Sequence, residues 1–211
     1  MSRRSGFIIV AVVALAAVGF WLLGFSSQAD RAEFEPDGHF VTMNAADTPA
    51  ETAEKYYQSL LPDMRERYAR SDDPAGKAYQ DWQRFNTAPY RSETHGERYV
   101  NNYGNDLASE YDLVRQGRAM PVGAILAKDA FAITTDGAVY AQSLFLMEKL
   151  EKGRSPTTAD WRYVMITPSG ETYGDTLGEN PDKVVFCHDC HRLVAESDYL
   201  FHIPEAYRAA E

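Results

Sequence analysis

The motif Cys187-His188-Asp189-Cys190-His191 lies near the C-terminal end of this 211-residue chain. Two cysteines separated by two residues and followed at once by a histidine form the pattern of a c-type haem attachment site. In that chemistry each thiol forms a thioether bond to one vinyl group of the haem, and the adjacent imidazole binds the iron. The sequence therefore predicts one covalently bound c-type haem, attached through Cys187 and Cys190, with His191 as the iron ligand.

The late position of this motif restricts the folds that the chain can adopt. Small helical electron-transfer cytochromes carry the motif early and supply a distal methionine downstream, but no methionine follows His191. Three of the methionines upstream of it lie in or beside apolar strands, where a methionine is usually core filler. They are Met120, Met147 and Met165. A four-helix cytochrome c′ also carries its motif late, but its body should show helical heptads, whereas residues 122–166 show strand patterns.

Zinc binding, a redox-active pair and a structural disulfide are the alternative interpretations of the two cysteines. A zinc site usually needs four ligands, but the chain has no further cysteine and its spare histidines are scattered at His39, His95 and His202. A redox pair normally follows a strand early in a thioredoxin-like unit, whereas this pair comes late. A disulfide suits an exported chain but gives the adjacent histidine no role. The haem interpretation accounts for all three residues.

The N-terminal segment predicts export. Residues 7–25 carry no charge and follow Arg3 and Arg4. Such a stretch is long enough to span a bilayer, and the arginines place the N-terminus on the cytoplasmic side. Small residues at Ser27-Gln28-Ala29 also suit signal cleavage, so residues 1–29 are interpreted as a membrane anchor, which we favour, or as a cleaved signal peptide. Either way the body lies on the periplasmic side, where bacteria attach c-type haem.

The acidic character of the chain restricts the classes of partner that it can bind. The formal net charge is −10. A negative surface disfavours nucleic acid and anionic membrane surfaces, since both would repel it. It is compatible with a basic redox partner. We therefore expect no nucleic-acid partner, and contact with the membrane only through the N-terminal helix.

Residues 30–89 are predicted to form a linker followed by a helical preface. Thr48 is a candidate helix cap, because proline follows it directly and glutamate stands three residues later. The helix is expected to run to about residue 70, with a break or kink at Pro62. A second helix is expected over residues 75–85.

Strand patterns dominate the rest of the chain. Asp136-Gly137 separates two apolar, partly β-branched segments and predicts a hairpin. A helix is expected from Asn105 or Asp106 to about Gly117. A loop over residues 171–182 leads into the haem motif. The predicted strands cover residues 98–103, 122–134, 138–149 and 161–166.

Four segments, taken in their order and spacing, resemble the cytochrome P-460 family over residues 90–208. They are His95 to Tyr103, Met120 to Lys128, Met147 to Lys149 with Asp160 to Tyr163, and the haem motif. The resemblance implies an α+β fold of mainly antiparallel sheet with flanking helices, usually dimeric. It also implies one haem with five-coordinate iron and an open distal face, so residues 90–211 are expected to be the haem domain. The related β-type cytochromes c′ bind small gases.

Lys128 is the residue that the resemblance singles out upstream of the motif. In family members that oxidise hydroxylamine, a lysine is joined to a meso carbon of the haem, and its position falls on Lys128. Considered by itself, Lys128 is a cation in an otherwise apolar strand, so it has to be paired, exposed, neutral or covalently consumed. The alternatives are an edge lysine that reaches solvent, or an ion pair with Asp129 or Glu148.

Arg98 matches a family arginine near the distal pocket, where a guanidinium could hydrogen-bond a ligand. The alternative is a cation on a solvated strand face. The distal carboxylate of hydroxylamine-oxidising members has no matching position here. Trp161 and Tyr163 are expected to pack beside the haem, and His188 is expected to be an exposed spacer.

These observations together predict an exported monohaem cytochrome of the P-460 type with an open distal site. It would bind or oxidise small nitrogen species such as hydroxylamine or nitric oxide, with Lys128 and Arg98 as catalytic candidates and an external redox partner. A non-enzymatic nitric oxide-binding protein and a simple electron-transfer cytochrome are the alternatives. A homodimer is expected.

Overall fold

The computed structural model describes residues 41–42 and 44–209, which belong to one compact unit, Asp37–Glu211. The predicted anchor or signal at residues 1–29 lies outside the described residues, as does His39. Among the residues that are described, no helix combines the length and the apolar character needed to cross a bilayer.

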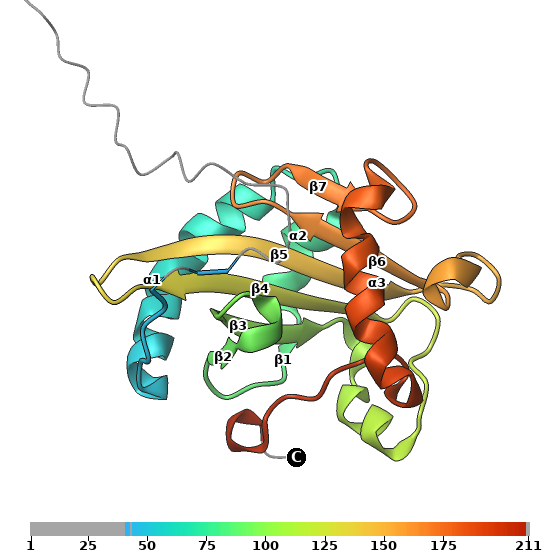
Figure 1. The fold of residues 1–211 in the computed structure, drawn as a ribbon, viewed down its shortest axis with the longest axis horizontal. Helices are drawn as coiled ribbons and strands as arrows, with labels where there is room; N and C mark the ends of the chain where they lie inside the picture. The colour runs from blue at the N-terminus through green and yellow to red at the C-terminus, as the bar shows by residue number, and fades with distance from the viewer. Residues whose placement is uncertain (1–40, 43, 210–211) are drawn as a thin grey trace, which may run out of the picture. The chain divides into compact units, whose positions relative to one another are not determined.

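A seven-stranded antiparallel sheet forms the centre of the fold (Figure 1). Its strands follow the order β1-β3-β4-β5-β6-β7, and β2 also pairs with β3. The predicted α+β class with a mainly antiparallel sheet is therefore confirmed. The strands are β1 (Gln83–Arg84), β2 (Tyr90–Ser92), β3 (Arg98–Gly104), β4 (Ile125–Ile133), β5 (Val139–Lys149), β6 (Trp161–Ile166) and β7 (Thr172–Asp175).

The longest strands lie where the sequence predicts them. β4 and β5 form the predicted hairpin, and Gly137 in its turn has a φ of 86°, which a side chain would strain. The three short strands β1, β2 and β7 were not predicted. β7 in particular lies inside residues 171–182, which were expected to form a loop. Glycine and aspartate are depleted in strands, so the sequence of this four-residue strand does not predict one.

The helices match the predictions less closely. The first helix, α1 (Ala50–Tyr68), is capped by Pro49 and not by Thr48, whose backbone N–H donates to Tyr99 Oη at 2.7 Å. The helix continues through Pro62 without the predicted break. Pro62 is exposed, so water can bond the carbonyl that the proline leaves unpaired.

The predicted helix at residues 75–85 is too long. It is α2 (Pro74–Ala78), capped by the Asp73 carboxylate, which accepts from Ala75 N–H at 2.9 Å. A 3₁₀ turn follows, and then β1. The predicted helix over 105–117 is also wrong in type, because two 3₁₀ segments replace it. The remaining elements are η2 (Tyr79–Asp81), η3 (Glu93–His95), η4 (Asp106–Ala108), η5 (Tyr111–Gln116), η6 (Pro156–Thr158), η7 (Pro181–Val184), α3 (Val185–His191), η8 (Arg192–Ser197) and η9 (Glu205–Tyr207).

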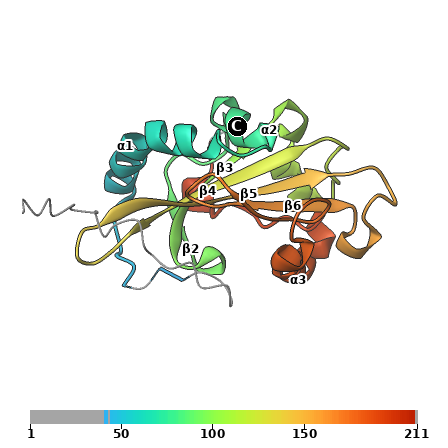
Figure 2. The same ribbon diagram turned by 90° about the horizontal axis from the view of Figure 1, so that it is seen from above.

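Strand alternation gives the two faces of the sheet different coverings. α1 and α2 lie on one face and α3 on the other (Figure 2). Alternate residues of β4 therefore belong to different cores: Ala127 and Phe131 pack with α1, whereas Leu126 and Ala130 pack toward the C-terminal segments.

Asp129 on the α1 side is fully buried and joins the layers together. Tyr57 of α1 donates to its carboxylate at 2.7 Å, Tyr79 at 3.0 Å and Asn101 at 3.0 Å. Burial nevertheless raises the pKa of Asp129 to about 6. This network holds the helical layer on the sheet, so residues 48–86 are part of the same packed body.

Candidate haem site

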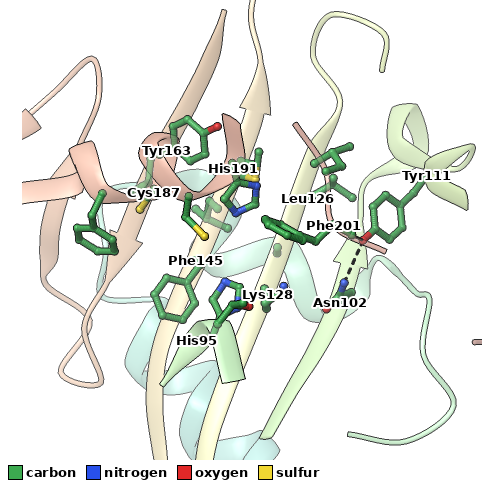
Figure 3. Close-up of a pocket in the computed structure, with 18 of the residues that line it drawn as sticks. His95, Asn102, Tyr111, Leu126, Lys128, Phe145, Tyr163, Cys187, His191 and Phe201 are labelled. Atoms are coloured by element: carbon green, nitrogen blue, oxygen red, sulfur yellow. Dashed lines mark hydrogen bonds between the residues drawn. The ribbon is translucent and has the colours of Figure 1, made fainter. Parts of the chain in front are cut away.

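The haem motif forms the helix α3 on the second face of the sheet (Figures 1 and 3). The spacing of Cys187, Cys190 and His191 corresponds to i, i+3 and i+4, which brings three side chains to one side of a helix. All three line a single pocket between α3 and the sheet. Both cysteines are free thiols, and burial raises the pKa of the Cys187 thiol to about 12.

The pocket is large and mostly apolar. It holds about 940 Å³ of space outside the protein atoms, including space open to solvent, which lies within the range of small-molecule and cofactor sites. Its walls come from η3, β3, η5, β4, β5, β6, α3 and the segment after η8. The side chains on these walls include Leu126, Phe145, Met147, Tyr163, Phe186, Leu200 and Phe201.

His191 is oriented as a metal ligand requires. Its Nδ1–H donates to the Tyr199 carbonyl at 2.6 Å, which leaves Nε2 as the nitrogen with a lone pair. Tyr163 and Phe201 hold the ring, with centroids at 5.6 and 5.3 Å. Burial lowers the pKa of His191 to about 4, so the imidazole is neutral, as a ligand must be.

Lys128 reaches the same pocket from the middle of the sheet. It pairs in register with Asn102 of β3 and Phe145 of β5, so β4 is not an edge strand and the edge-lysine alternative is wrong. The proposed partners are also wrong: Asp129 lies on the opposite face, and Glu148 accepts from Arg162 at 3.0 Å.

Burial lowers the pKa of Lys128 to about 8. Within the described residues its ammonium group has no hydrogen bond or ion pair. A lysine held in this way is partly unprotonated near neutral pH, and its amine is then a nucleophile.

Arg98 is buried and not on a solvated face, since its exposed fraction is 3%. It lines the pocket, and its guanidinium carbon lies 5.9 Å from the centroid of the Phe145 ring. Burial lowers the pKa of Arg98 to about 10, so the group remains a cation at neutral pH. The structure therefore brings both upstream candidates into one pocket with the haem motif.

His95 is a pocket residue that the sequence did not single out. In Figure 3 it lies with Phe145 across the pocket from His191, and the centroids of the His95 and Phe145 rings are 5.2 Å apart. Its Nδ1 hydrogen-bonds Ser92 Oγ at 3.1 Å and Thr94 Oγ1 at 3.3 Å, which fixes the ring. The signal available in the sequence was its position three residues before Arg98. Both side chains line the pocket.

Most of the remaining histidines and methionines considered in the sequence lie in or near the pocket or in the core. His188 is half-buried and stacks on Tyr199 at 5.6 Å, so its prediction as an exposed spacer is wrong. Asn102 donates to Tyr111 Oη at 3.3 Å beside the pocket. Met147 lines the pocket, whereas Met120 and Met165 are buried in the core. His202 is absent from the pocket wall in the described structure.

The residues of the pocket fit a c-type haem. Two free thiols and one neutral imidazole with an available Nε2 form the donor set that such a haem needs. Tyr163 also lines the pocket, and its buried hydroxyl has no hydrogen-bond partner among the described residues. A group with an acceptor oxygen, such as a haem propionate, would satisfy it. No three His, Cys, Asp or Glu side chains in residues 41–42 and 44–209 converge as a site for a bare metal ion.

The chain matches a known protein family. A family model described as cytochrome P460 matches residues 76–202, which is more than half of the chain. The match starts earlier than residue 90 and takes in part of α2. No curated protein matches the chain.

Proposed function

Because the chain belongs to the cytochrome P460 family, whose cofactor is a c-type haem, we propose that its pocket oxidises small nitrogen species such as hydroxylamine. Cys187 and Cys190 hold the haem and His191 binds the iron. The observation that carries the proposal is the convergence of Lys128, Arg98 and His191 on one pocket. When bound, the haem supplies an iron that accepts electrons and binds a small ligand.

Attachment of the haem needs no oxidant. Each thiol would add across one vinyl group: a C–S bond would form, and the thiol proton would go to the neighbouring vinyl carbon. The i, i+3 spacing on α3 presents both sulfurs to the same pocket, and the Nδ1–H bond to Tyr199 keeps His191 in the tautomer that binds iron.

Arg98 binds and orients the substrate. Its buried guanidinium remains charged and donates hydrogen bonds to the oxygen of hydroxylamine or of another small ligand. The apolar walls exclude bulk water, which strengthens these bonds. Oxidation of hydroxylamine to the level of nitroxyl releases two protons and two electrons, and an external redox partner accepts the electrons.

Lys128 modifies the haem covalently in this proposal. A bond from its Nζ to a meso carbon would replace one N–H bond and one C–H bond. Its formation would release two protons and two electrons, and would therefore need a two-electron oxidant such as a peroxide. The lowered pKa of Lys128 and its lack of an ion-pair partner among the described residues favour the nucleophilic amine.

The test combines the ferrous absorption spectrum, the intact mass of the holoprotein and hydroxylamine oxidation with an artificial electron acceptor. We expect the spectrum of a cross-linked haem in the wild type, an ordinary c-type spectrum in Lys128→Ala, and at least a tenfold lower rate in that variant. Exposed Lys152 provides the control, and Lys152→Ala should behave as the wild type. A wild-type protein with no lysine-to-haem bond and no hydroxylamine oxidation would disprove the enzymatic proposal.

Binding of nitric oxide without catalysis is the second candidate. It is favoured by the composition of the pocket wall, where no Asp or Glu occurs among the described residues. A proton relay through a distal carboxylate therefore has no visible group here. An unchanged spectrum and undiminished nitric oxide binding in Lys128→Ala would support this candidate. A high-spin, five-coordinate ferric spectrum would exclude simple electron transfer through a six-coordinate haem.

Export and assembly complete the proposal. The uncharged stretch at residues 7–25 supports an inner-membrane anchor with the haem domain on the periplasmic side. Membrane fractionation and the intact mass together distinguish an anchor from a cleaved signal. We also propose a homodimer, as the family resemblance implies, and sedimentation of the holoprotein tests it.

A further inference from the structure

The carbonyl that accepts from His191 belongs to an unusual turn after η8. Asp198 has a φ of 50° and Tyr199 a φ of 66°, both in the left-handed region. Two consecutive left-handed residues with side chains are costly, and for tyrosine especially so. Such a turn persists only where its surroundings hold it. Its effect is to bring the Tyr199 carbonyl within 2.6 Å of His191 Nδ1.

A buried ion pair holds this turn in place. Lys149 Nζ donates to Asp198 Oδ1 at 2.6 Å, and their side chains are only 15% and 10% exposed. The backbone N–H of Met120 donates to Asp198 Oδ2 at 2.7 Å, and the Lys149 ammonium lies 4.6 Å from the centroid of the Trp161 ring. The Asp198 carboxylate is thus fixed from both sides, by the end of β5 and by the segment before β4.

The hydrogen bond to the Tyr199 carbonyl affects the iron ligand directly. A histidine that donates from one ring nitrogen becomes more basic at the other, and a more basic ligand stabilises the ferric state. A carbonyl that moves away from Nδ1 weakens this effect. Its position is therefore a means of setting the reduction potential, and none of the residues that fix it touches the pocket.

We propose that Lys149 and Asp198 are positioning residues for the iron ligand, because their ion pair fixes the Tyr199 carbonyl against His191. The pair acts through the backbone of the turn and not through its own charge. The proposal rests on His191 as the iron ligand, and it is independent of whether the protein oxidises hydroxylamine.

The decisive variant is Lys149→Met/Asp198→Ala in the holoprotein. It removes one charge of each sign, so the net charge is unchanged and a charge effect on the potential is minimised. We expect the iron–histidine stretching frequency of the ferrous protein, measured by resonance Raman, to fall. The reduction potential should rise at the same time, because the ferric state loses stabilisation.

The control variant is Arg70→Met/Glu66→Ala, which removes an exposed ion pair at the C-terminal end of α1. It should leave both readouts at their wild-type values. Lys149→Arg keeps the charge and the contact with Asp198, and should restore both readouts. If the double variant does not retain haem, Lys149→Gln is the milder substitute and should shift the frequency in the same direction.

An iron–histidine frequency that stays at the wild-type value in haem-loaded Lys149→Met/Asp198→Ala and Lys149→Gln would overturn the proposal. So would equal shifts in the Arg70→Met/Glu66→Ala control. A wild-type protein without covalent haem would instead contradict the proposed function, and its mass distinguishes the two failures.

Discussion

At the scale of single residues, Lys128 and Asp129 show that two consecutive residues of a strand can have entirely different surroundings. They are neighbours in β4, yet Lys128 lines the pocket and Asp129 lies under α1 with three donors. An ion pair between them is one of the alternatives that the sequence allows, and the period of two in a strand excludes it. Lys128 remains a candidate for chemistry, whereas Asp129 is structural.

Asp129 should give the stability of the fold a distinct pH dependence. Its folded pKa of about 6 is above the ordinary value of 3.8, so the folded state holds the proton more tightly. Its contribution to stability is therefore fully present below about pH 4 and is lost as the pH rises through 6. We expect wild-type stability relative to Asp129→Asn to fall by about 2 kcal/mol between pH 4 and pH 7.

Urea unfolding across that range measures the difference. The surface variant Asp182→Asn serves as the control, since Asp182 is exposed. A difference between wild type and Asp129→Asn that is constant with pH would show that burial does not perturb this carboxyl group.

Arg98 yields a second prediction at this scale. Arg98→Gln removes the cation that lines the pocket and should weaken binding of hydroxylamine or nitric oxide by about 10-fold or more, as expected for loss of a charged hydrogen bond. Ligand titration followed by absorption measures the affinity. Arg154→Gln changes an exposed arginine and should have no effect; if it weakens binding equally, Arg98 has no specific role.

At the scale of elements, the segments that could be predicted were those with a long and regular pattern of apolar residues. The hairpin of β4 and β5 and the strand β6 could be read from the sequence because long alternating segments flank a clear turn. The short strands could not, because two to four residues carry no period. α2 ends early because the buried Tyr79 donates to Asp129, a tertiary contact that local propensity does not encode.

The same limit applies to the candidate site. The motif fixed Cys187, Cys190 and His191 on one side of a helix, and the resemblance pointed to Lys128 and Arg98. His95 was missed because a single histidine has no pattern. The Lys149–Asp198 pair was missed because its members are 49 positions apart, and only the fold brings them together.

The turn between β6 and β7 gives a prediction for an element boundary. Gly170 has a φ of 90°, and a Cβ there would lie 2.1 Å from the Arg67 carbonyl oxygen at the end of α1. Gly170→Ala should therefore destabilise the fold by about 2 kcal/mol or more, through strain and displacement of the helix end. Thermal or urea unfolding measures the loss.

Gly153 is a matched control for this variant. It has a φ of 84°, but a Cβ there would meet no atom within 4 Å. Gly153→Ala should cost only about 1 kcal/mol, from the left-handed backbone alone. Equal losses in the two variants would mean that the contact with α1 is not tight.

At the scale of the whole molecule, the two faces of the sheet have different roles. Its α1 face is a tyrosine-rich core that holds the helical layer, and its α3 face forms the pocket. The pocket draws its residues from Thr94 to Phe201, so the haem would connect segments that are distant in the chain.

Covalent attachment should therefore contribute to stability as well as to chemistry. In the Lys128→Ala background, which lacks the proposed lysine bond, Cys187→Ala/Cys190→Ala should make the haem extractable by acidified organic solvent. The melting temperature should fall by about 5 °C or more relative to Lys128→Ala, since a ligand that dissociates stabilises the native state less. Calorimetry of both proteins tests this. Haem that resists extraction from the triple variant, in which Lys128 and both cysteines are replaced, would refute thioether attachment at these cysteines.

The order of segments along the chain has a consequence for biosynthesis. Every strand that lines the pocket precedes α3, so a growing chain can complete its sheet before the cysteines become available. Under the proposed thioether attachment, the haem would then meet a nearly complete pocket instead of an extended peptide. Thioether formation would be a late step, and a chain whose sheet has failed to form would reach it without a place for the cofactor.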